Sequence, residues 1–417
     1  MNAPWDIAYC RSQFPALARQ VGGKPAAFFD GPAGSQVPQR VIDAVGHYLA
    51  HTNANHGGEF ATSYESDALL DTAHQTVADF LGASDPGEVA FGPNMTTLTF
   101  ALSRALAQTW QPGDEILVSQ SDHDANVTPW VLAARDAGAT VHHIPLRPED
   151  CTLDLEGFYR LLNSRTRLVA LGCASNATGT IHAFPQMIEA AHAAGAEVFL
   201  DAVHYAPHLP IDVTAWQCDY LACSAYKFFG PHLGVLWGRR ERLEALPAYK
   251  LRPAPNDLPG KWMTGTQSHE AIAGTAAAIE YLADLGRHHH GDATLGRRAA
   301  LLAAYEGIAR YERGLAIQFL SALAEMHAFR LWGIAQADRL HERVPTFCFT
   351  HDTLPSREIA RRLGELGLFV WHGNYYALPL TQALGLEPEG AVRVGILHYN
   401  TAEEIDRLLE ALASLNR

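Results

Sequence analysis

One lysine in this sequence stands among unusually apolar neighbours. Lys227 lies in the stretch SAYKFFGPH, between a tyrosine and two phenylalanines and just before a Gly-Pro pair. Burial disfavours the charged ammonium, and a neutral lysine amine is a nucleophile that can attack a carbonyl group. The ordinary alternative is a side chain that lies along an apolar surface with its charge in water.

Other polar side chains follow apolar runs of the strand type. His123 comes after EILVSQ, Asn176 follows LVALGCAS, and Asp201 follows AEVFL. Met95 and Thr96 open an amphipathic segment, whose N-terminus could hold a phosphate through free N–H groups and the helix dipole. Each alone is compatible with a cap or a loop residue. Because ligands of open parallel sheets bind beyond the carboxyl ends of the strands, the set indicates one common site.

The ligand that uses all these groups is pyridoxal phosphate. Lys227 would form a Schiff base with its aldehyde. Asp201 would keep the ring nitrogen protonated, so that the ring acts as an electron sink. His123 can stack on the ring, and Asn176 can bond the phenolate oxygen. A nucleotide-binding Rossmann domain is disfavoured because no G-x-G-x-x-G follows a strand and no P-loop is present.

The elements around these residues alternate between strands and helices. Amphipathic segments at 95–110, 128–138 and 184–195 separate apolar runs, and Gly138 and Gly195 stand at expected helix ends. This alternation predicts a mostly parallel sheet covered by helices on both faces. The predicted strands are 88–92, 114–120, 140–146, 167–175, 197–203, 220–226 and 234–239.

The pattern changes after residue 240. Residues 243–270 are expected to form a long ordered loop and 271–327 to be helical. Strands are predicted at 344–350, 368–373 and 391–397, and helices at 356–366 and 401–415, the last opened by a capping box of Thr401 and Glu404. We therefore predict an N-terminal arm (1–20) that packs with the small domain, a large cofactor-binding domain (21–275) and a smaller α+β domain (276–417).

The composition limits the possible partners. The 417 residues are 48% hydrophobic and carry a formal net charge of -14, which disfavours nucleic acid and anionic membranes as partners. No signal peptide or spanning segment is evident, so a cytoplasmic protein is expected. The six cysteines form no CxxC and indicate free thiols. The spacing of His204, His208 and His232 matches no standard metal-ligand set, so no metal is expected.

At the level of motifs, the chain resembles the class V aminotransferase family of fold type I pyridoxal phosphate enzymes, most closely its cysteine desulfurase-like branch. FFDGPAGSQVPQRVIDAV resembles the opening segment of that branch. SQSDHDANVTPW resembles its stacking-histidine motif, with His123, and SNATGT its asparagine motif, with Asn176. DAVHYAPH resembles a D-x-x-[QH] motif, which assigns Asp201 to the ring nitrogen and His204 to the phenolate oxygen.

Further motifs follow in the family's order. SAYKFFGP resembles S-x-[HY]-K, which implies that Ser224 and Tyr226 bind phosphate and that Lys227 is the Schiff-base lysine. TGTQ resembles the segment whose threonine, here Thr266, reaches the phosphate of the neighbouring subunit. AVRVGILHYN resembles the motif whose arginine, here Arg393, holds the substrate carboxylate. The resemblance implies a seven-stranded fold type I domain and a homodimer with shared active sites.

One segment departs from the family. Desulfurases carry their sulfur-accepting cysteine in a loop of the type R-x-G-x-x-C-A, and the matching stretch here is WHGNYYALP, residues 371–379. Tyr376 stands at the cysteine position and Trp371 at the arginine position. Persulfide chemistry needs a thiolate, so we expect it to be lost. Tyr375 and Tyr376 are expected either to line the substrate pocket, with a chemical role for Tyr376, or to pack the loop.

These observations predict an enzyme that binds an amino acid as an external aldimine and removes its Cα proton with Lys227. With a leaving group on Cβ, the expected reaction is β-elimination, as in C–S lyases. Without one, the same carbanion permits transamination or epimerisation. The alternative from another class is a catalytically silent protein that only binds pyridoxal phosphate.

Overall fold

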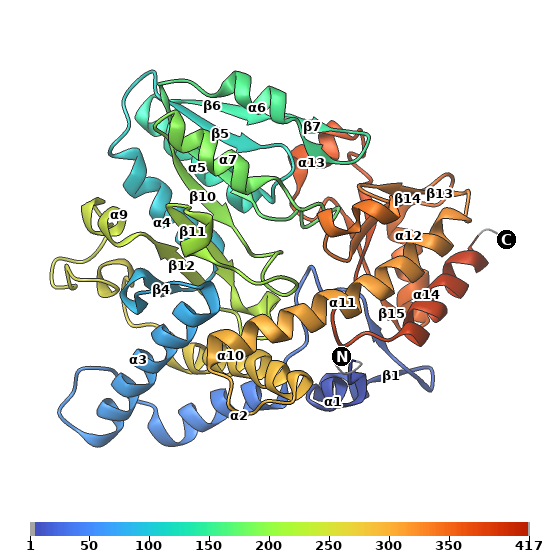
Figure 1. Ribbon diagram of the computed structural model, residues 1–417, viewed down its shortest axis with the longest axis horizontal. Coiled ribbons are helices and arrows are strands. Elements are labelled where there is room, and N and C mark those ends of the chain that lie inside the picture. The colour runs from blue at the N-terminus through green and yellow to red at the C-terminus, as the bar shows by residue number, and fades with distance from the viewer. Residues whose placement is uncertain (1–4, 416–417) are drawn as a thin grey trace.

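The computed structural model describes residues 5–415, and a seven-stranded sheet forms its centre (Figure 1). The strand order is β4-β12-β11-β10-β9-β5-β6. β12 runs antiparallel to both its neighbours, and the remaining neighbouring strands are parallel. The predicted sheet is confirmed, with β4 (Val89–Gly92), β5 (Glu115–Ser119), β6 (Thr140–Ile144), β9 (Thr166–Gly172), β10 (Glu197–Asp201), β11 (Tyr220–Ser224) and β12 (Gly234–Gly238).

Alternation along the strands builds a separate core on each face of the sheet. On β5, Ile116 and Val118 belong to the core beneath α4 (Met95–Ala107) and α5 (Thr128–Ala137). Leu117 belongs to the opposite core, beneath α3 (Ala61–Leu81), α7 (Phe184–Ala193) and α10 (His269–His290). Successive side chains of a strand point to opposite faces, so strands covered on both sides are apolar throughout, as the sequence pattern indicated.

Specific residues end and begin the helices. Gly138 ends α5 in the left-handed conformation at φ +73°, which glycine adopts without strain. Gly195 has φ +84° and follows the cap of α7 at Ala194. The capping box of Thr401 and Glu404 opens α14 (Ala402–Ser414) as predicted.

A second, antiparallel sheet has the order β13-β14-β17-β16, and α12 (Ser356–Glu365), α14 and α11 (Arg297–Ala324) contribute to the core beside it. Its strands are β13 (Phe329–Trp332), β14 (Thr346–His351), β16 (Trp371–Gly373) and β17 (Ala391–Gly395). The run predicted at 368–373 is divided, because β15 (Leu368–Phe369) pairs instead with β3 (Ala27–Phe28) from the N-terminal region. β13 was not predicted, since four residues with one exposed arginine give little periodicity.

The N-terminal region touches both halves of the molecule. Tyr9 of α1 (Ile7–Ser12) stacks on His288 of α10, and Arg11 bonds the Tyr399 carbonyl and Glu404 of α14. Residues 1–4 of the expected arm lie outside the described residues, and the domain boundaries stay a prediction. Between 246 and 268 the chain forms turns, one short 3-10 helix (Gly260–Trp262) and no strand. The remaining α-helices and strands are β1 (Gln20–Val21), β2 (Lys24–Pro25), α2 (Gln39–His47), β7 (Leu146–Arg147), β8 (Thr152–Leu153), α6 (Leu155–Leu161), α8 (Val213–Trp216), α9 (Arg240–Ala245) and α13 (Leu378–Ala383).

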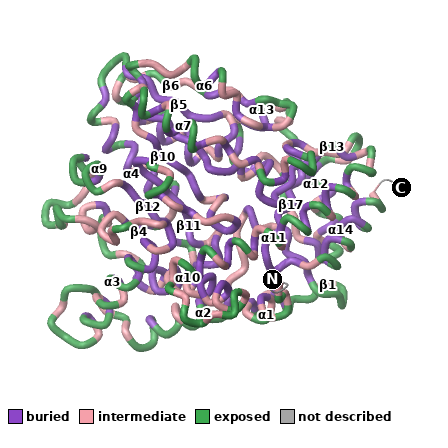
Figure 2. Tube along the Cα trace, viewed as in Figure 1, coloured by how far each residue is buried: buried purple, intermediate pink, exposed green. Residues whose placement is uncertain are grey.

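The burial pattern follows this layering. The strands of the large sheet are largely buried, apart from the edge strand β6, whereas most exposed residues lie on the outer faces of the helices and on loops (Figure 2). Within residues 5–415, no helix combines the length and apolarity needed to cross a bilayer.

Candidate active site

A cavity lies at the carboxyl ends of the central parallel strands. It collects residues that are far apart in the sequence, as expected where strands of a parallel sheet end together. The predicted residues that line it are Met95, Thr96, His123, Asn176, Asp201, His204, Ser224, Tyr226 and Lys227.

Lys227 follows β11 and is partly buried. Its Nζ donates a hydrogen bond to the Pro32 carbonyl and lies 4.7 Å from the centre of the Tyr226 ring. Burial, followed by the positive charge of Arg393, lowers the pKa of Lys227 to about 7, against the opposing influence of Asp201 and Asp30. A substantial fraction of the amine is therefore neutral near pH 7, as a nucleophile requires.

Two carboxyl groups lie at the base of the cavity. Asp201, the last residue of β10, accepts a 2.8 Å hydrogen bond from the Val203 N–H through Oδ1. Burial raises its pKa to about 6. Asp122, which the sequence analysis did not select, is fully enclosed and accepts from the N–H of Gly172 at 2.9 Å. Burial, and then repulsion from Asp201, raise the pKa of Asp122 to about 8.

The first turn of α4 faces the cavity. Asn94 caps the helix by accepting from the Thr97 N–H at 2.8 Å, and the Met95 N–H donates to Ser224 Oγ at 3.1 Å. Within the described chain, this leaves the Thr96 N–H without a protein partner. A free N–H at the start of a 13-residue helix suits a phosphate group.

His123 presents a neutral ring to the cavity. Burial, with the charges of Lys227 and Arg393, lowers its pKa to about 4. Nδ1 accepts from the Ala125 N–H at 3.0 Å, so the ring proton resides on Nε2. On its other side lies the Tyr376 ring, at a centroid distance of 5.4 Å and an interplanar angle of 25°.

The smaller sheet contributes to the same site. His204 bonds Thr346 of β14 through Nε2 at 3.0 Å. Asn176 donates to the Tyr375 carbonyl at 3.0 Å, and its Oδ1 is buried with no hydrogen-bond partner in the described chain. Because buried polar atoms are rarely left unpaired, this free oxygen indicates a ligand. The amide oxygen and nitrogen of Asn176 are interchangeable by rotation, so either can face a phenolic oxygen.

Arg393 of β17 is a buried cation. Nη1 donates to the Asn176 carbonyl at 2.9 Å, and the guanidinium lies 4.3 Å from the centre of the Tyr375 ring. No carboxylate of the described residues lies within ion-pair distance of it. Burial lowers its pKa to about 10, so it remains charged at neutral pH. A buried guanidinium without a counter-ion is suited to a ligand carboxylate.

The loop at 371–379 has a distinctive geometry. Tyr375 and Tyr376 both adopt left-handed backbone conformations, with φ of +56° and +58°. Tyr375 is buried against Arg393 and donates its hydroxyl to the Ala391 carbonyl, whereas Tyr376 is 72% exposed beside His123. All six cysteines are buried and lie elsewhere, and burial raises the pKa of Cys10 and Cys151 to about 12.

Thr266 is exposed and lies outside the cavity of its own chain. Asp122 and the carbonyl of Pro32 were missed, although Asp122 stands beside His123 after a strand and could have been found by the same reasoning. Asp30 was also missed; burial raises its pKa to about 6, against the attraction of Arg393 and Lys227.

The donor set fits pyridoxal phosphate. It supplies an amine of low pKa, a buried carboxylate, a neutral ring, an unpaired amide oxygen and a free helix N–H. Comparison with known proteins agrees, because the model of the class V aminotransferase family matches residues 27–408. The chain belongs to this family of pyridoxal phosphate-dependent enzymes.

Relatives within the family are named cysteine desulfurases. One from Pectobacterium atrosepticum is 31% identical over 99% of this chain and 98% of its own length. A probable cysteine desulfurase from Vibrio cholerae is 32% identical, with 96% of each chain covered. The crystal structure of the cysteine desulfurase CsdA from Escherichia coli superposes with a TM-score of 0.84 at 28% identity, covering 99% of this chain and 98% of that one. This class V enzyme is thus of the cysteine desulfurase type in fold.

Proposed function

We propose that this class V enzyme cleaves the C–S bond of a sulfur-bearing amino acid by β-elimination, without passing sulfur to a cysteine of its own. The loop at 371–379 carries this proposal. It places the exposed Tyr376 beside His123 and contains no cysteine, while every cysteine of the chain is buried. A buried thiol of raised pKa forms little thiolate.

The chain's own groups would divide the work as follows. Arg393 would bind the substrate carboxylate, and Lys227 would accept the Cα proton. Asp201 would hold the proton on the cofactor's ring nitrogen, with His123 stacked on the ring, His204 and Asn176 at its phenolic oxygen, and Met95, Thr96, Ser224 and Tyr226 around the phosphate. Bound pyridoxal phosphate supplies the electron sink that stabilises negative charge at the substrate Cα. The sulfur would leave Cβ with its bonding electrons as a thiol or sulfide.

The same residues could serve transamination or epimerisation of a substrate that lacks a leaving group on Cβ. A silent cofactor-binding protein is the remaining alternative. The low pKa of Lys227 and the unpaired buried charge of Arg393 argue against it, because both are costly to keep in a protein that does no chemistry.

We further propose a cytoplasmic homodimer in which Thr266 of one subunit reaches the phosphate site of the other. Large apolar side chains are exposed on α2, α3 and the segments beside them, and on the loop before residue 252. Such exposure is costly in a monomer and typical of an interface. The residues are Ile42, Leu49, Phe60, Tyr64, Tyr249 and Leu251.

The test is to incubate the holoenzyme with cysteine, an S-alkyl cysteine and alanine, and to identify the products. We expect pyruvate, ammonia and sulfide or thiol in equal amounts, and no persulfide on the protein. Alanine formed together with protein persulfide would overturn the proposal in favour of desulfuration. A new amino acid would indicate transamination, and racemised substrate would indicate epimerisation.

The Schiff-base lysine has a separate test. Borohydride should fix pyridoxal phosphate covalently to the wild-type chain and to a Lys250→Ala control, but not to Lys227→Ala. Covalent cofactor at wild-type yield in Lys227→Ala would show that another amine is used.

A further inference from the structure

The segment DGPAGSQ, residues 30–36, has no assigned role in the proposed reaction, yet it lies between the two halves of the site. At one end, Asp30 pairs with Gly395, the last residue of β17, in an isolated parallel bridge. A Cβ atom on Gly395 would lie 2.0 Å from Pro32 Cδ, so the segment packs directly on this strand. At its other end the segment contacts the turn that carries Lys227.

Ser35 binds the main chain on both sides of Lys227. Its N–H and its hydroxyl group both donate to the carbonyl of Tyr226, at 3.0 and 3.1 Å. The same hydroxyl oxygen accepts a 2.8 Å hydrogen bond from the N–H of Phe229. One side chain therefore closes the turn from the residue before the lysine to the second residue after it.

The turn that Ser35 closes contains a strained residue. Phe229 has φ of +70°, a left-handed conformation that bulky side chains rarely adopt. Both neighbouring phenylalanine rings are fully buried, Phe228 against Phe80 and Phe229 against His398. Such strain persists only where the surrounding structure fixes it. Within residues 5–415, the Phe229 N–H has Ser35 Oγ as its hydrogen-bond partner.

The amine of Lys227 is held by the same segment. Nζ donates to the carbonyl of Pro32, three residues before Ser35. The segment thus holds Lys227 at both ends, its main chain through Ser35 and its amine through Pro32. Because the lysine stem is flexible, its amine reaches one reacting carbon efficiently only from a fixed main chain.

We infer that Ser35 is a positioning residue for Lys227. The Ser35 hydroxyl fixes the point from which the lysine side chain enters the cofactor cavity, and the Pro32 carbonyl holds the amine while it is not bonded to the cofactor. This inference rests on the proposed role of Lys227 as the Schiff-base lysine. Ser35 itself does not line the cavity, so it acts through the lysine by raising the effective concentration of the amine at the cofactor aldehyde.

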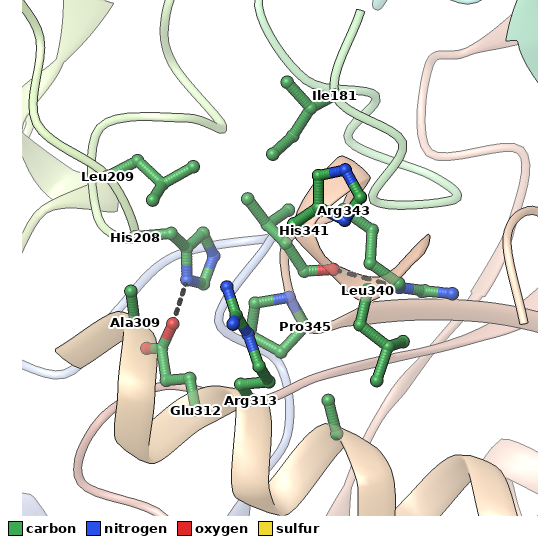
Figure 3. Close-up of a pocket in the computed structure, with 12 residues that line it drawn as sticks. Ile181, His208, Leu209, Ala309, Glu312, Arg313, Leu340, His341, Arg343 and Pro345 are labelled. Carbon is green, nitrogen blue, oxygen red and sulfur yellow. Dashed lines mark hydrogen bonds and ion pairs between the residues drawn. The ribbon is translucent and has the colours of Figure 1, made fainter. Parts of the chain in front are cut away.

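The two halves of the molecule are also joined away from Ser35. His208, in the loop after β10, and Glu312 of α11 form a buried pair with 2.8 Å between Nδ1 and Oε2 (Figure 3). No residue of 30–36 lines the hollow beside this pair. We therefore expect loss of the Ser35 hydroxyl to loosen the lysine turn while the two halves stay docked and the cofactor stays bound.

Competition with methylamine in the holoenzyme measures how firmly Lys227 is held. Methylamine displaces the lysine from the cofactor aldehyde and is not turned over, because it has no Cβ–S bond. Borohydride then fixes to the chain only the cofactor that is still bonded to Lys227. In Ser35→Ala, the methylamine concentration that halves the fixed cofactor should fall about tenfold, because a misplaced amine competes less well.

Two variants serve as controls at the same pH. Ser35→Thr keeps the hydroxyl group and should need close to the wild-type concentration of methylamine. Ser356→Ala removes a buried hydroxyl that donates to the Glu389 carbonyl at 2.8 Å beside the smaller sheet. It should lower Tm, as Ser35→Ala does, but leave the methylamine concentration unchanged. A shared loss of stability therefore cannot account for a change confined to Ser35→Ala.

An unchanged methylamine concentration in Ser35→Ala would overturn the role of Ser35, and so would an equal fall in Ser356→Ala. Should Ser35→Ala fail to fold, Ser35→Cys still decides the matter, because a thiol is a weak donor and acceptor and should give a smaller fall in the same direction. Borohydride fixation in the wild type tests Lys227 itself. Its failure would reject the lysine assignment, whereas unchanged competition in the Ser35 variants would reject only the role of Ser35.

Discussion

The guanidinium of Arg393, on the smaller sheet, donates a 2.9 Å hydrogen bond to the main-chain carbonyl of Asn176, in the loop after β9 of the large sheet. The cation thus contacts Asn176, which lines the cofactor pocket, from the other half of the molecule. Among the described residues, Nη1 alone of the guanidinium nitrogens has a hydrogen-bond partner, so the other N–H groups of Arg393 stay available to a carboxylate.

Arg393→Lys should therefore raise KM for the amino-acid substrate by about tenfold or more, because an ammonium cannot form the two-point contact. The absorbance of the bound cofactor should not change. Arg330→Lys, at an exposed position on β13, is the matched control and should behave as wild type. A normal KM in Arg393→Lys would place the substrate carboxylate elsewhere.

Asp201→Asn should leave the fold intact and lower turnover on the order of 10²-fold, a typical contribution for a residue that controls a catalytic proton. The neutral amide cannot stabilise a protonated ring nitrogen. Steady-state kinetics and cofactor titration check this, and cofactor affinity should fall less than turnover. Near-normal turnover would mean that the ring nitrogen is not protonated in this enzyme.

Asp122 should make stability depend on pH. Its pKa is raised from 3.8 to about 8 in the folded chain. Between these values the unfolded state loses the proton while the folded state keeps it, so this group lowers the free energy of unfolding as pH rises from about 4 to 8. Asp122→Asn has no carboxyl group at this position and so lacks this pH dependence. Urea denaturation should therefore show that the free energy of unfolding of the variant, relative to that of the wild type, is higher at pH 8 than at pH 5.

We also expect Asp122→Asn to differ from the wild type in its free energy of unfolding by an amount that is the same at both pH values. The Asp122 carboxyl accepts from Asn126 Nδ2 at 2.9 Å, and an amide nitrogen placed there would face another donor. The pH dependence of the difference is the diagnostic quantity. A difference that is constant from pH 5 to 8 would show that Asp122 does not titrate in this range.

Tyr376→Phe separates a chemical role from a packing role. Tyr376 is 72% exposed, so removing its hydroxyl should change stability by less than about 0.5 kcal/mol. Lost turnover with unchanged cofactor absorbance and Tm would support a proton-donating hydroxyl near the leaving group. Full turnover would show that Tyr376 has a packing role only, with its ring against His123.

Tyr375→Phe is the matched comparison for that experiment. Its hydroxyl bonds the Ala391 carbonyl, and losing a buried hydrogen bond should cost about 1 kcal/mol of folding stability. A loss of stability confined to Tyr375→Phe would show that the two neighbouring tyrosines have different tasks.

Light scattering coupled to size exclusion should give twice the monomer mass. Phe60→Asp, within the exposed apolar face, should weaken this assembly, because it places a charge where apolar area is proposed to be buried. Tyr159→Asp changes a comparably exposed aromatic residue on α6, away from that face, and should leave the mass unchanged. A monomer with full cofactor occupancy would contradict the shared active site.

The sequence by itself determined the large sheet and the groups at its carboxyl edge. Strands buried on both faces are continuously apolar, and each polar residue that ends one stands out, so Lys227, Asp201, His123 and Asn176 were identified without coordinates. The capping box at Thr401 was equally visible, because its signal is local.

Only the tertiary structure decided which residues from distant parts of the chain contact one another. The approach of Arg393 to Asn176, the pairing of Thr346 with His204 and the joining of β3 to β15 connect residues that lie far apart in the chain. No short-range pattern encodes such contacts, since they depend on how two sheets dock. The position of Asp122 after a strand is visible in the sequence, but its burial and raised pKa are set by neighbours that folding brings together.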